Sequence, residues 1–180
     1  GKVFIYGAQL LLWPPTLLNI HVDENEIMFA TRSEMLQKVV DFAESKNNAA
    51  IRLCGKLESE ISTLPTKEKS MFLKEYNLSE PGLNKLITAS FSLLGLETFF
   101  TCGPQEVRAW TIGKGMAAPR TAREIHSDIE RGFIKAEVYQ FGEIMEFGSE
   151  SALRDAGKIR QEGKSYIVQD GDVIFFKFNV

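Results

Sequence analysis

Apolar residues in the first half of the chain alternate between short continuous runs and helical spacing. The runs TLLNIH (residues 16–21) and AAIRLCG (residues 49–55) are typical of strands buried on both faces of a parallel sheet. Residues 2–7 predict one further short strand, and VDENE (residues 22–26) predicts a polar turn. The segment between the two runs predicts a helix from apolar residues at helical spacing, which are Met35, Leu36, Val39, Val40 and Phe42. The order strand–helix–strand favours a parallel crossover.

Capping and breaking residues set the expected helix ends in this half. Thr31 is expected to cap the helix at 33–45, with Glu34 at the capping-box position. Two more helices are predicted over 56–64 and 66–78, the second capped by Thr66. A last helix is predicted to begin near Pro81 and to end at Gly95. Residues up to about 96 therefore read as part of an α/β layer closed by helices.

From residue 97 the spacing changes to the two-residue alternation of a half-buried sheet. ETFFTC (97–102) and EVRAWTI (106–112) flank Gly103-Pro104 and predict a hairpin, with Trp110 and Ile112 on one face. A helix over 121–132, a strand over 133–141, a helix over 149–163 between Ser149 and Gly163, and a strand pair around the QDGD turn at 169–172 follow. This order predicts an α+β fold of the β-grasp, ubiquitin-like type.

The charge balance limits the partners that the whole chain would attract. The formal net charge of −3 gives no global positive field for nucleic acid or membrane. Five basic residues nonetheless fall close together in the sequence: Arg108, Lys114, Arg120, Arg123 and Arg131. They form either a solvated face or a set of phosphate contacts. The longest apolar run, residues 10–18, is too short for a bilayer and contains two prolines, so we expect a cytosolic protein without membrane contact.

Several kinds of chemistry find no support in the residues. No GxxxxGK[ST] phosphate loop and no nucleophile elbow occur, and only two histidines are present, so we expect neither a catalytic residue nor a metal site. Cys54 and Cys102 are expected to be small core residues. His126 is expected on a helix surface, held by a hydrogen bond. The segments HVDE and CGKLE follow the two buried runs, at the strand ends where open α/β sheets bind ligands.

Longer stretches resemble a known family. GPQEVRAWTI, IHSDIERGFI and VQDGDVIFFKFN, extended backward by EPGLNKLITASFSLLGLETFFT, look like the C-terminal part of the YchF-type Obg-like ATPases. The resemblance implies two domains. Residues 1–96 would be the C-terminal portion of an Obg-like nucleotide-binding domain of P-loop type, here without its phosphate loop. Residues 97–180 would be a TGS domain, a β-grasp module.

The resemblance also implies where a nucleotide base would lie. In the family a strand ends in Asn-x-x-Glu, and here HVDE falls on that strand, with His21 at the position of Asn and Glu24 at the position of Glu. Val22 lies between them, and Cys54, Gly55 and Lys56 fall on the later loop that packs against the base. Histidine in place of asparagine changes the donor and acceptor geometry. ATP or GTP with Mg²⁺ is the ligand implied for the full-length family, with no cofactor for this chain alone as the alternative.

The resemblance implies one function for the chain, and two alternative functions stay open. The first reading is a regulatory protein associated with the ribosome or RNA through Arg108, Lys114, Arg120 and Arg123. The family's phosphate loop, switch segments and Mg²⁺-holding residues would all precede residue 11, so we expect no ATP hydrolysis by this chain alone. The rivals are a nucleotide-binding subunit that needs a second chain, and a non-catalytic TGS interaction module. A homodimer or a second chain would cover the open sheet edge of residues 1–96.

Overall fold

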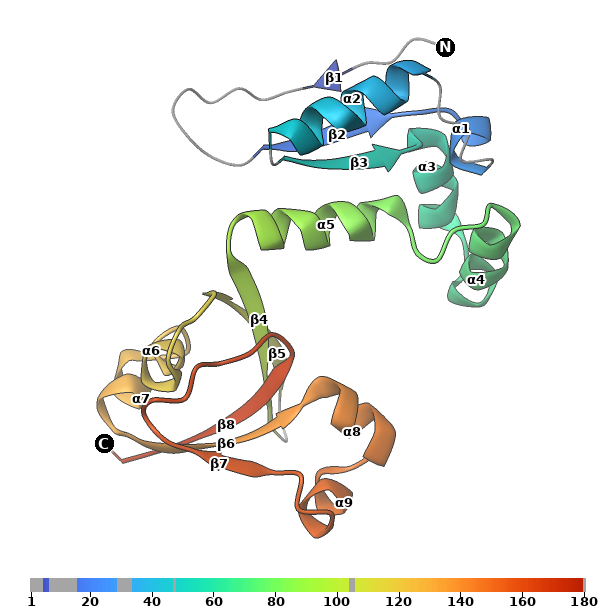
Figure 1. The fold of residues 1–180 in the computed structure, drawn as a ribbon. Helices are drawn as coiled ribbons and strands as arrows, with labels where there is room; N and C mark the ends of the chain where they lie inside the picture. The colour runs from blue at the N-terminus through green and yellow to red at the C-terminus, as the bar shows by residue number, and fades with distance from the viewer. Residues whose placement is uncertain (1–4, 7–15, 29–33, 47, 104–105, 180) are drawn as a thin grey trace. The chain divides into compact units, whose positions relative to one another are not determined.

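The chain folds into two compact units, Gly1–Leu94 (unit 1) and Gly95–Val180 (unit 2) (Figure 1). The computed structural model describes residues 5–6, 16–28, 34–46, 48–103 and 106–179. The predicted cap Thr31 and the turn residue Pro104 lie outside these residues. Within the described ranges, no helix combines the length and the apolar character that crossing a bilayer requires.

Unit 1 is built on a three-stranded sheet in the order β1-β2-β3. Strand β1 (Ile5–Tyr6) is antiparallel to β2 (Leu17–His21), and β2 is parallel to β3 (Ala49–Leu53) over its whole length. Helix α2 (Glu34–Ser45) connects the two parallel strands, so the predicted crossover is confirmed. Leu36 of this helix packs against Ile20 and Val22, which forms the small core of the unit.

Four further helices complete unit 1: α1 (Glu24–Met28), α3 (Gly55–Thr63), α4 (Thr66–Glu75) and α5 (Gly82–Leu93). The predicted polar turn at 22–26 is instead the start of α1, because the Asp23 carboxylate accepts a hydrogen bond from the Glu26 backbone N–H at 2.9 Å. Thr66 was expected as a cap but is the first helical residue, and Pro65 occupies the cap position. Gly95 follows α5 in the left-handed conformation (φ 62°), as expected for a helix stop.

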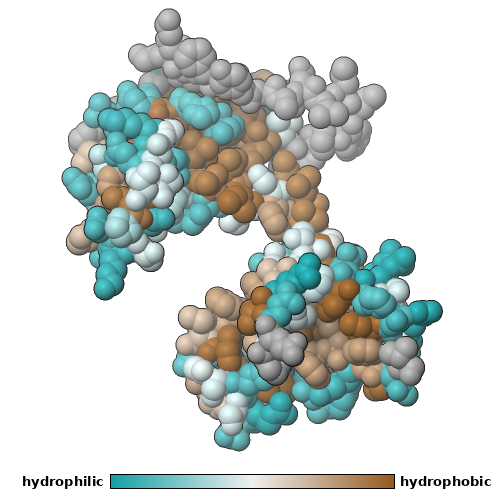
Figure 2. Space-filling view, turned by 180° about the vertical axis from the view of Figure 1, so that it is seen from behind, coloured by the Kyte–Doolittle hydropathy of each residue, from teal (hydrophilic) through white to brown (hydrophobic). Residues whose placement is uncertain are grey.

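The core of unit 1 is smaller than the sequence predicts. Of the residues in β2 and β3 only Ile20 and Leu53 are buried, so burial of both strands on both faces was a wrong expectation. Met35 and Phe42 of α2 are more than half exposed. In α5, Leu83 and Ile87 are also about half exposed. Hydrophobic surface is accordingly visible on this unit in the space-filling view (Figure 2).

Unit 2 contains a five-stranded mixed sheet in the order β5-β4-β8-β6-β7. Its strands are β4 (Leu96–Cys102), β5 (Val107–Gly113), β6 (Phe133–Gln140), β7 (Arg160–Glu162) and β8 (Asp172–Phe178). Only the pair β4–β8 is parallel, and the predicted β4–β5 hairpin is confirmed with Phe99 opposite Trp110. Ile112 is buried and Trp110 packs against the same core, whereas Val107 on the opposite face is 70% exposed, as the alternation predicts.

Short helices cover this sheet: α6 (Ala118–Ala122), α7 (Ser127–Arg131), α8 (Phe141–Phe147) and α9 (Glu150–Asp155). The single helix predicted over 121–132 was wrong, because His126 has extended backbone and its Nδ1 accepts from the Asp128 N–H at 3.1 Å, starting a new helix. Ser149 caps its helix as predicted, but the helix ends at Asp155 rather than near Gly163, and residues 160–162 form β7. Helix α8 had no predicted counterpart.

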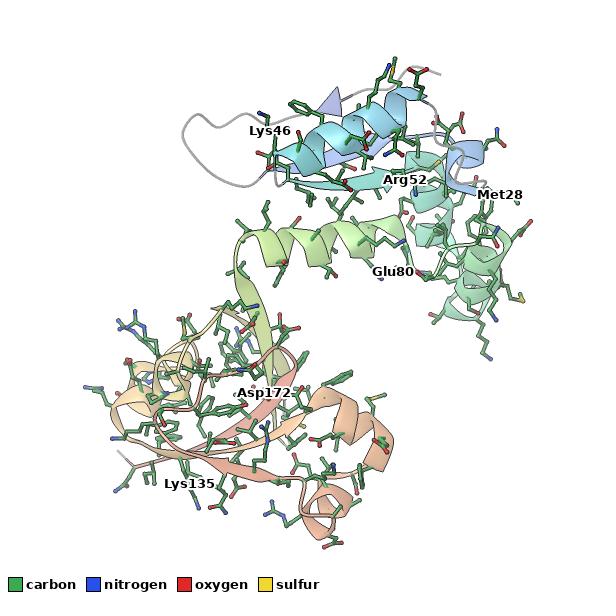
Figure 3. The ribbon with its side chains drawn as sticks, in the orientation of Figure 1. Met28, Lys46, Arg52, Glu80, Lys135 and Asp172 are labelled. Atoms are coloured by element: carbon green, nitrogen blue, oxygen red, sulfur yellow. The ribbon has the colours of Figure 1, made fainter. Side chains whose placement is uncertain are left out.

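The C-terminal segment also departs from its prediction. Only 172–178 is a strand, while Ile167 forms an isolated bridge with Ala117, so the predicted strand pair is wrong. The reason is Asp172, which is fully buried inside unit 2 (Figure 3) and whose carboxylate accepts from the Tyr166 hydroxyl at 2.7 Å and the Gln169 N–H at 2.9 Å. These side-chain bonds fold the segment before β8 into a turn instead of a ladder.

Candidate functional site

The carboxyl ends of β2 and β3 lie side by side, because the two strands are parallel and in register. His21 stands opposite Leu53, and the Val22 N–H donates to the Leu53 carbonyl at 2.9 Å. The His21 side chain is exposed, whereas Val22 is buried in the core of unit 1. The loops that follow the two strands therefore begin within one peptide hydrogen bond of each other.

Glu24 and Lys56, which sequence reasoning placed at a base site, meet at this edge. Glu24 begins α1 and Lys56 is the second residue of α3, and their Oε1 and Nζ atoms are 2.7 Å apart. The hydrogen bond and the charge of Glu24 raise the pKa of Lys56. The pair is largely solvated, with the side chains 34% and 66% exposed, so it contributes little to stability and can exchange partners.

Tyr76, at the end of α4, lies near this ion pair. Burial raises the pKa of its hydroxyl, and the negative charges of Glu24 and Glu60 raise it further. Sequence reasoning missed Tyr76, since an aromatic residue at the end of a predicted helix carries no local sign of its distant neighbours. The charges of Glu24 and Lys56 thus both act on the Tyr76 hydroxyl.

The other two predicted base contacts frame the site without offering polar side chains. Cys54 is buried, as predicted, and occupies the cap position of α3 without a side-chain hydrogen bond. Gly55 is exposed, and a Cβ added there would meet no atom within 4 Å. This open backbone leaves room for a flat ligand to approach the start of α3. The expectation that both cysteines are core residues was wrong for Cys102, which is exposed.

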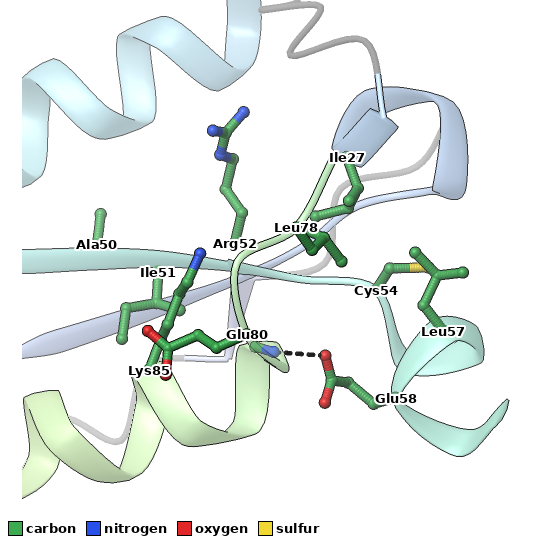
Figure 4. A pocket seen from close by; sticks show the side chains of 11 residues that line it. Ile27, Ala50, Ile51, Arg52, Cys54, Leu57, Glu58, Leu78, Glu80 and Lys85 are labelled. Atoms are coloured by element: carbon green, nitrogen blue, oxygen red, sulfur yellow. Dashed lines mark hydrogen bonds between the residues drawn. The ribbon is translucent and has the colours of Figure 1, made fainter. Parts of the chain in front are cut away.

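A pocket of about 240 Å³ runs along β3 beside this edge (Figure 4). Its wall is fixed by Glu58, whose carboxylate accepts from the backbone N–H groups of Gly82 at 2.7 Å and Leu83 at 3.2 Å. These are among the amide groups that the first turn of α5 leaves unpaired, so Glu58 acts as a cap supplied by another helix. Arg52 and Lys85 contribute positive charge to the same pocket.

Replacing Glu58 with alanine is expected to destabilise unit 1 by about 1–2 kcal/mol, since two helix-terminal N–H groups lose their acceptor. Urea unfolding measures the free energy, and hydrogen exchange at the amides of Gly82 and Leu83 locates the effect. Glu44→Ala, an exposed carboxylate near the end of α2, is the matched control. Equal stability of the two variants would contradict the assigned role.

The four basic residues predicted to contact RNA fall into separate environments in unit 2. Arg120 Nη1 and Arg123 Nε lie 4.0 and 3.7 Å from the Glu130 carboxylate, and Lys114 Nζ lies 3.8 Å from that of Glu97. Arg108 lies over the Trp110 ring, with its Cζ 4.1 Å from the ring centroid. The structure thus brings Arg120 and Arg123 together and gives Arg108 an aromatic partner.

Known proteins resemble the chain along almost its whole length. Residues 96–179 match the family model YchF-GTPase_C, described as a protein of unknown function (DUF933). A Bacillus subtilis protein named "Ribosome-binding ATPase YchF" is 50% identical over 172 residues, which cover 96% of this chain and 47% of that protein. The rat protein "Obg-like ATPase 1" is 42% identical over 181 residues, which cover 99% of this chain and 45% of that protein.

Solved structures agree with these relatives. The YchF GTPase of Schizosaccharomyces pombe superposes with a TM-score of 0.75 at 29% identity, covering 91% of this chain and 43% of that chain. A GTP-binding protein of Pyrococcus horikoshii superposes with a TM-score of 0.61 at 15% identity, which shows a shared fold. The chain spans about half the length of the curated relatives that it matches. Sequence and structure together show that the chain belongs to the YchF-type Obg-like ATPase family and corresponds to its C-terminal part.

Proposed function

We propose that the chain is the part of a ribosome- or RNA-associated ATPase-family regulatory protein that reads the nucleotide base and docks to RNA. The observation that carries this proposal is the meeting of Glu24 and Lys56 at the carboxyl edge of β2 and β3, in a chain 50% identical to a protein named a ribosome-binding ATPase. Ligands of open α/β sheets bind at this edge.

The two units support distinct roles. Unit 2, with central strand β8 parallel to β4 and antiparallel to β6, is proposed as a TGS domain of β-grasp type over residues 97–180. Unit 1, with its parallel β2–β3 pair, is proposed as the C-terminal portion of a P-loop-type nucleotide-binding domain over residues 1–96. Nucleotide binding is assigned to unit 1 and ribosome or RNA binding to unit 2.

The base site uses each residue in a defined way. The Glu24 carboxylate accepts from the exocyclic amino group of adenine, and Lys56 lays its aliphatic stem along the base. Exposed His21 offers one donor and one acceptor in its neutral form, while Val22, Cys54 and Gly55 form the floor and the open backbone. When bound, ATP with Mg²⁺ would bring phosphoryl chemistry. No three His, Cys, Asp or Glu side chains of the described residues cluster as metal ligands.

The rival proposal is a subunit completed by a second chain or a second copy. Strand β3 is an edge strand among the described residues, and an open edge is a template for pairing. Measurement of the molar mass in solution tests completion by a second copy, because a dimer would cover this edge while a monomer would leave it open.

Cosedimentation with ribosomes tests the docking role. The triple variant Arg108, Arg120 and Arg123 to Glu is expected to lower ribosome affinity at least about tenfold, and wild-type binding is expected to weaken as salt rises, because phosphate contacts release counterions. Arg154, Lys158 and Lys164 to Glu is a control triple with the same charge change elsewhere on unit 2. Equal losses in both triples, or none in either, would refute the assignment of the docking face.

A further inference from the structure

In unit 2 the side chains of Phe99, Trp110 and Arg108 pack on one another in that order and form a stacked column. Phe99 is fully buried, and its ring stacks on Trp110 with centroids 6.3 Å apart and planes 15° from parallel. Trp110 is fixed by a hydrogen bond from Nε1 to the Thr101 hydroxyl at 2.9 Å, and the Arg108 guanidinium lies over its ring. Packing on Trp110 therefore restricts the exposed Arg108 guanidinium in the free protein. Part of the conformational entropy of the Arg108 side chain is thus lost before any ligand binds.

The charge of Arg108 is available to an anion. Lys114, Arg120 and Arg123 each have a carboxylate within 4.0 Å, whereas no ion pair links Arg108 to a carboxylate among the described residues. A planar guanidinium without a carboxylate partner is suited to bidentate contact with phosphate and to stacking with a base. Arg108 thus differs from the other three predicted contacts in having no carboxylate partner among the described residues.

A groove of about 510 Å³ adjoins this column. Trp110, Ile125, Ile129 and Phe176 give it an apolar lining, and Glu106 contributes a carboxylate. Arg108 lies two residues before Trp110 on β5, and residues two apart on a strand share a face. Its guanidinium lies over the Trp110 ring, which lines the groove, so it lies beside the groove. The volume lies within the range of small-ligand sites and is ample for one nucleobase.

We propose that this groove and Arg108 bind an unstacked nucleobase and its phosphate in single-stranded RNA, an inference that rests on the proposed RNA-docking role of unit 2. The apolar lining receives the base, Arg108 contacts the phosphate or stacks on the base, and Glu106 accepts from an exocyclic amino group. Cytosine and adenine carry that group and uracil does not, so the site prefers C or A to U. An acidic peptide fits less well, because its carboxylate side chains bring no flat apolar ring to the lining of the groove.

Trp110 supplies a direct readout. The chain has two tryptophans, so a Trp13→Phe background leaves Trp110 as the single reporter. Titration with 12-nucleotide oligo(C) is expected to quench Trp110 fluorescence, with weaker binding of oligo(U). Arg108→Ala is expected to lower the affinity for oligo(C) about tenfold or more, with Arg108→Lys intermediate because lysine lacks the planar fork. The control Arg131→Ala, which removes an exposed arginine paired with Asp128, is expected to bind like the parent.

The outcomes separate this inference from the function on which it rests. If the parent binds ribosomes and oligo(C) but Arg108→Ala binds equally well, or if Trp110 does not respond, the groove assignment is wrong and the docking role stands. If the parent binds neither ribosomes nor RNA, both the groove assignment and the docking role are wrong. Binding of oligo-glutamate with the same dependence on Arg108 would overturn RNA in favour of an acidic peptide. Circular dichroism of Arg108→Ala confirms that a loss of binding is not a loss of fold.

Discussion

Replacing Asp172 with alanine is expected to destabilise unit 2 by about 3 kcal/mol or more, which lowers its Tm by about 10–20 °C. The carboxylate is fully buried and accepts hydrogen bonds from the side chains of Gln140 and Tyr166 and from the Gln169 N–H, with Arg160 Nη2 3.4 Å away. Removal leaves buried donors without an acceptor, which costs more than the net worth of the bonds themselves.

A second readout identifies the mechanism. Burial, and then the hydrogen bond to Asp172, raises the pKa of Tyr166 to about 12. In Asp172→Ala this pKa is expected to fall, because the hydrogen bond and the charge of Asp172 are lost while the effect of burial remains, and ultraviolet titration follows the change. Asp155→Ala, an exposed carboxylate on α9, is the matched control and is expected to change stability by less than about 0.5 kcal/mol. A Tm of Asp172→Ala close to that of this control would show that the buried cluster does not hold the fold.

Replacing Gly132 with alanine is expected to destabilise unit 2 by about 1–3 kcal/mol. Gly132 is compatible with alanine in its backbone conformation (φ −88°), but a Cβ there would collide with the carbonyl oxygen of Asn179. The Asn179 N–H donates to the Gly132 carbonyl at 2.9 Å, so the two backbones meet where β6 begins and β8 ends. The Asn179 backbone cannot move aside as a flexible side chain can. The hydrogen bond between Asn179 and Gly132 and the adjoining pairing of β6 with β8 must therefore shift.

Gly142 provides the matched control for this prediction. It lies inside α8, and a Cβ added there would meet no atom within 4 Å. Gly142→Ala is therefore expected to raise stability by about 0.5–1 kcal/mol through helix propensity. Urea unfolding of both variants gives the two free energies. If Gly132→Ala also stabilised the protein, the close approach of the two backbones would be wrong.

Local patterns sufficed for elements that depend on neighbours in sequence. The hairpin of β4 and β5 follows from two-residue alternation on both sides of one turn, and Trp110 faces the core as that alternation requires. The parallel pair β2–β3 follows from two apolar runs separated by one amphipathic helix. Ser149 caps α9 because its hydroxyl accepts a hydrogen bond from the Ala152 N–H, only three residues away.

Elements that depend on distant or competing contacts were not predictable. Asp172 reads as an ordinary turn residue, and its burial depends on Gln140, 32 residues earlier. His126 reads as part of a continuous helix, and only its bond to the following backbone shows that it interrupts one. The capping box of Gln140 and Glu143, which starts α8, was not recognised.

The residues of the candidate site were predictable from the sequence, but the ion pairs that they form were not. The family resemblance gave Glu24 and Lys56, and the structure adds that they form an ion pair near Tyr76. The sequence likewise predicted four basic residues as RNA contacts, and only the structure shows that Arg108 alone among these four lacks a carboxylate partner within the described chain. Charge counts cannot make this distinction, because it depends on which acids fold beside each base.

Equilibrium dialysis of labelled ATP and GTP against the 180-residue chain, with and without Mg²⁺, shows whether the ends of β2 and β3 bind an adenine base. We expect ATP to be retained in excess of GTP, and Glu24→Gln to reduce this excess, because the neutral amide is a weaker acceptor for the adenine amino group. Glu34→Gln, an exposed carboxylate at the start of α2, is expected to leave it unchanged. Equal retention of the two nucleotides, no retention of either, or an excess insensitive to Glu24 would contradict the assignment of a base site to the ends of β2 and β3.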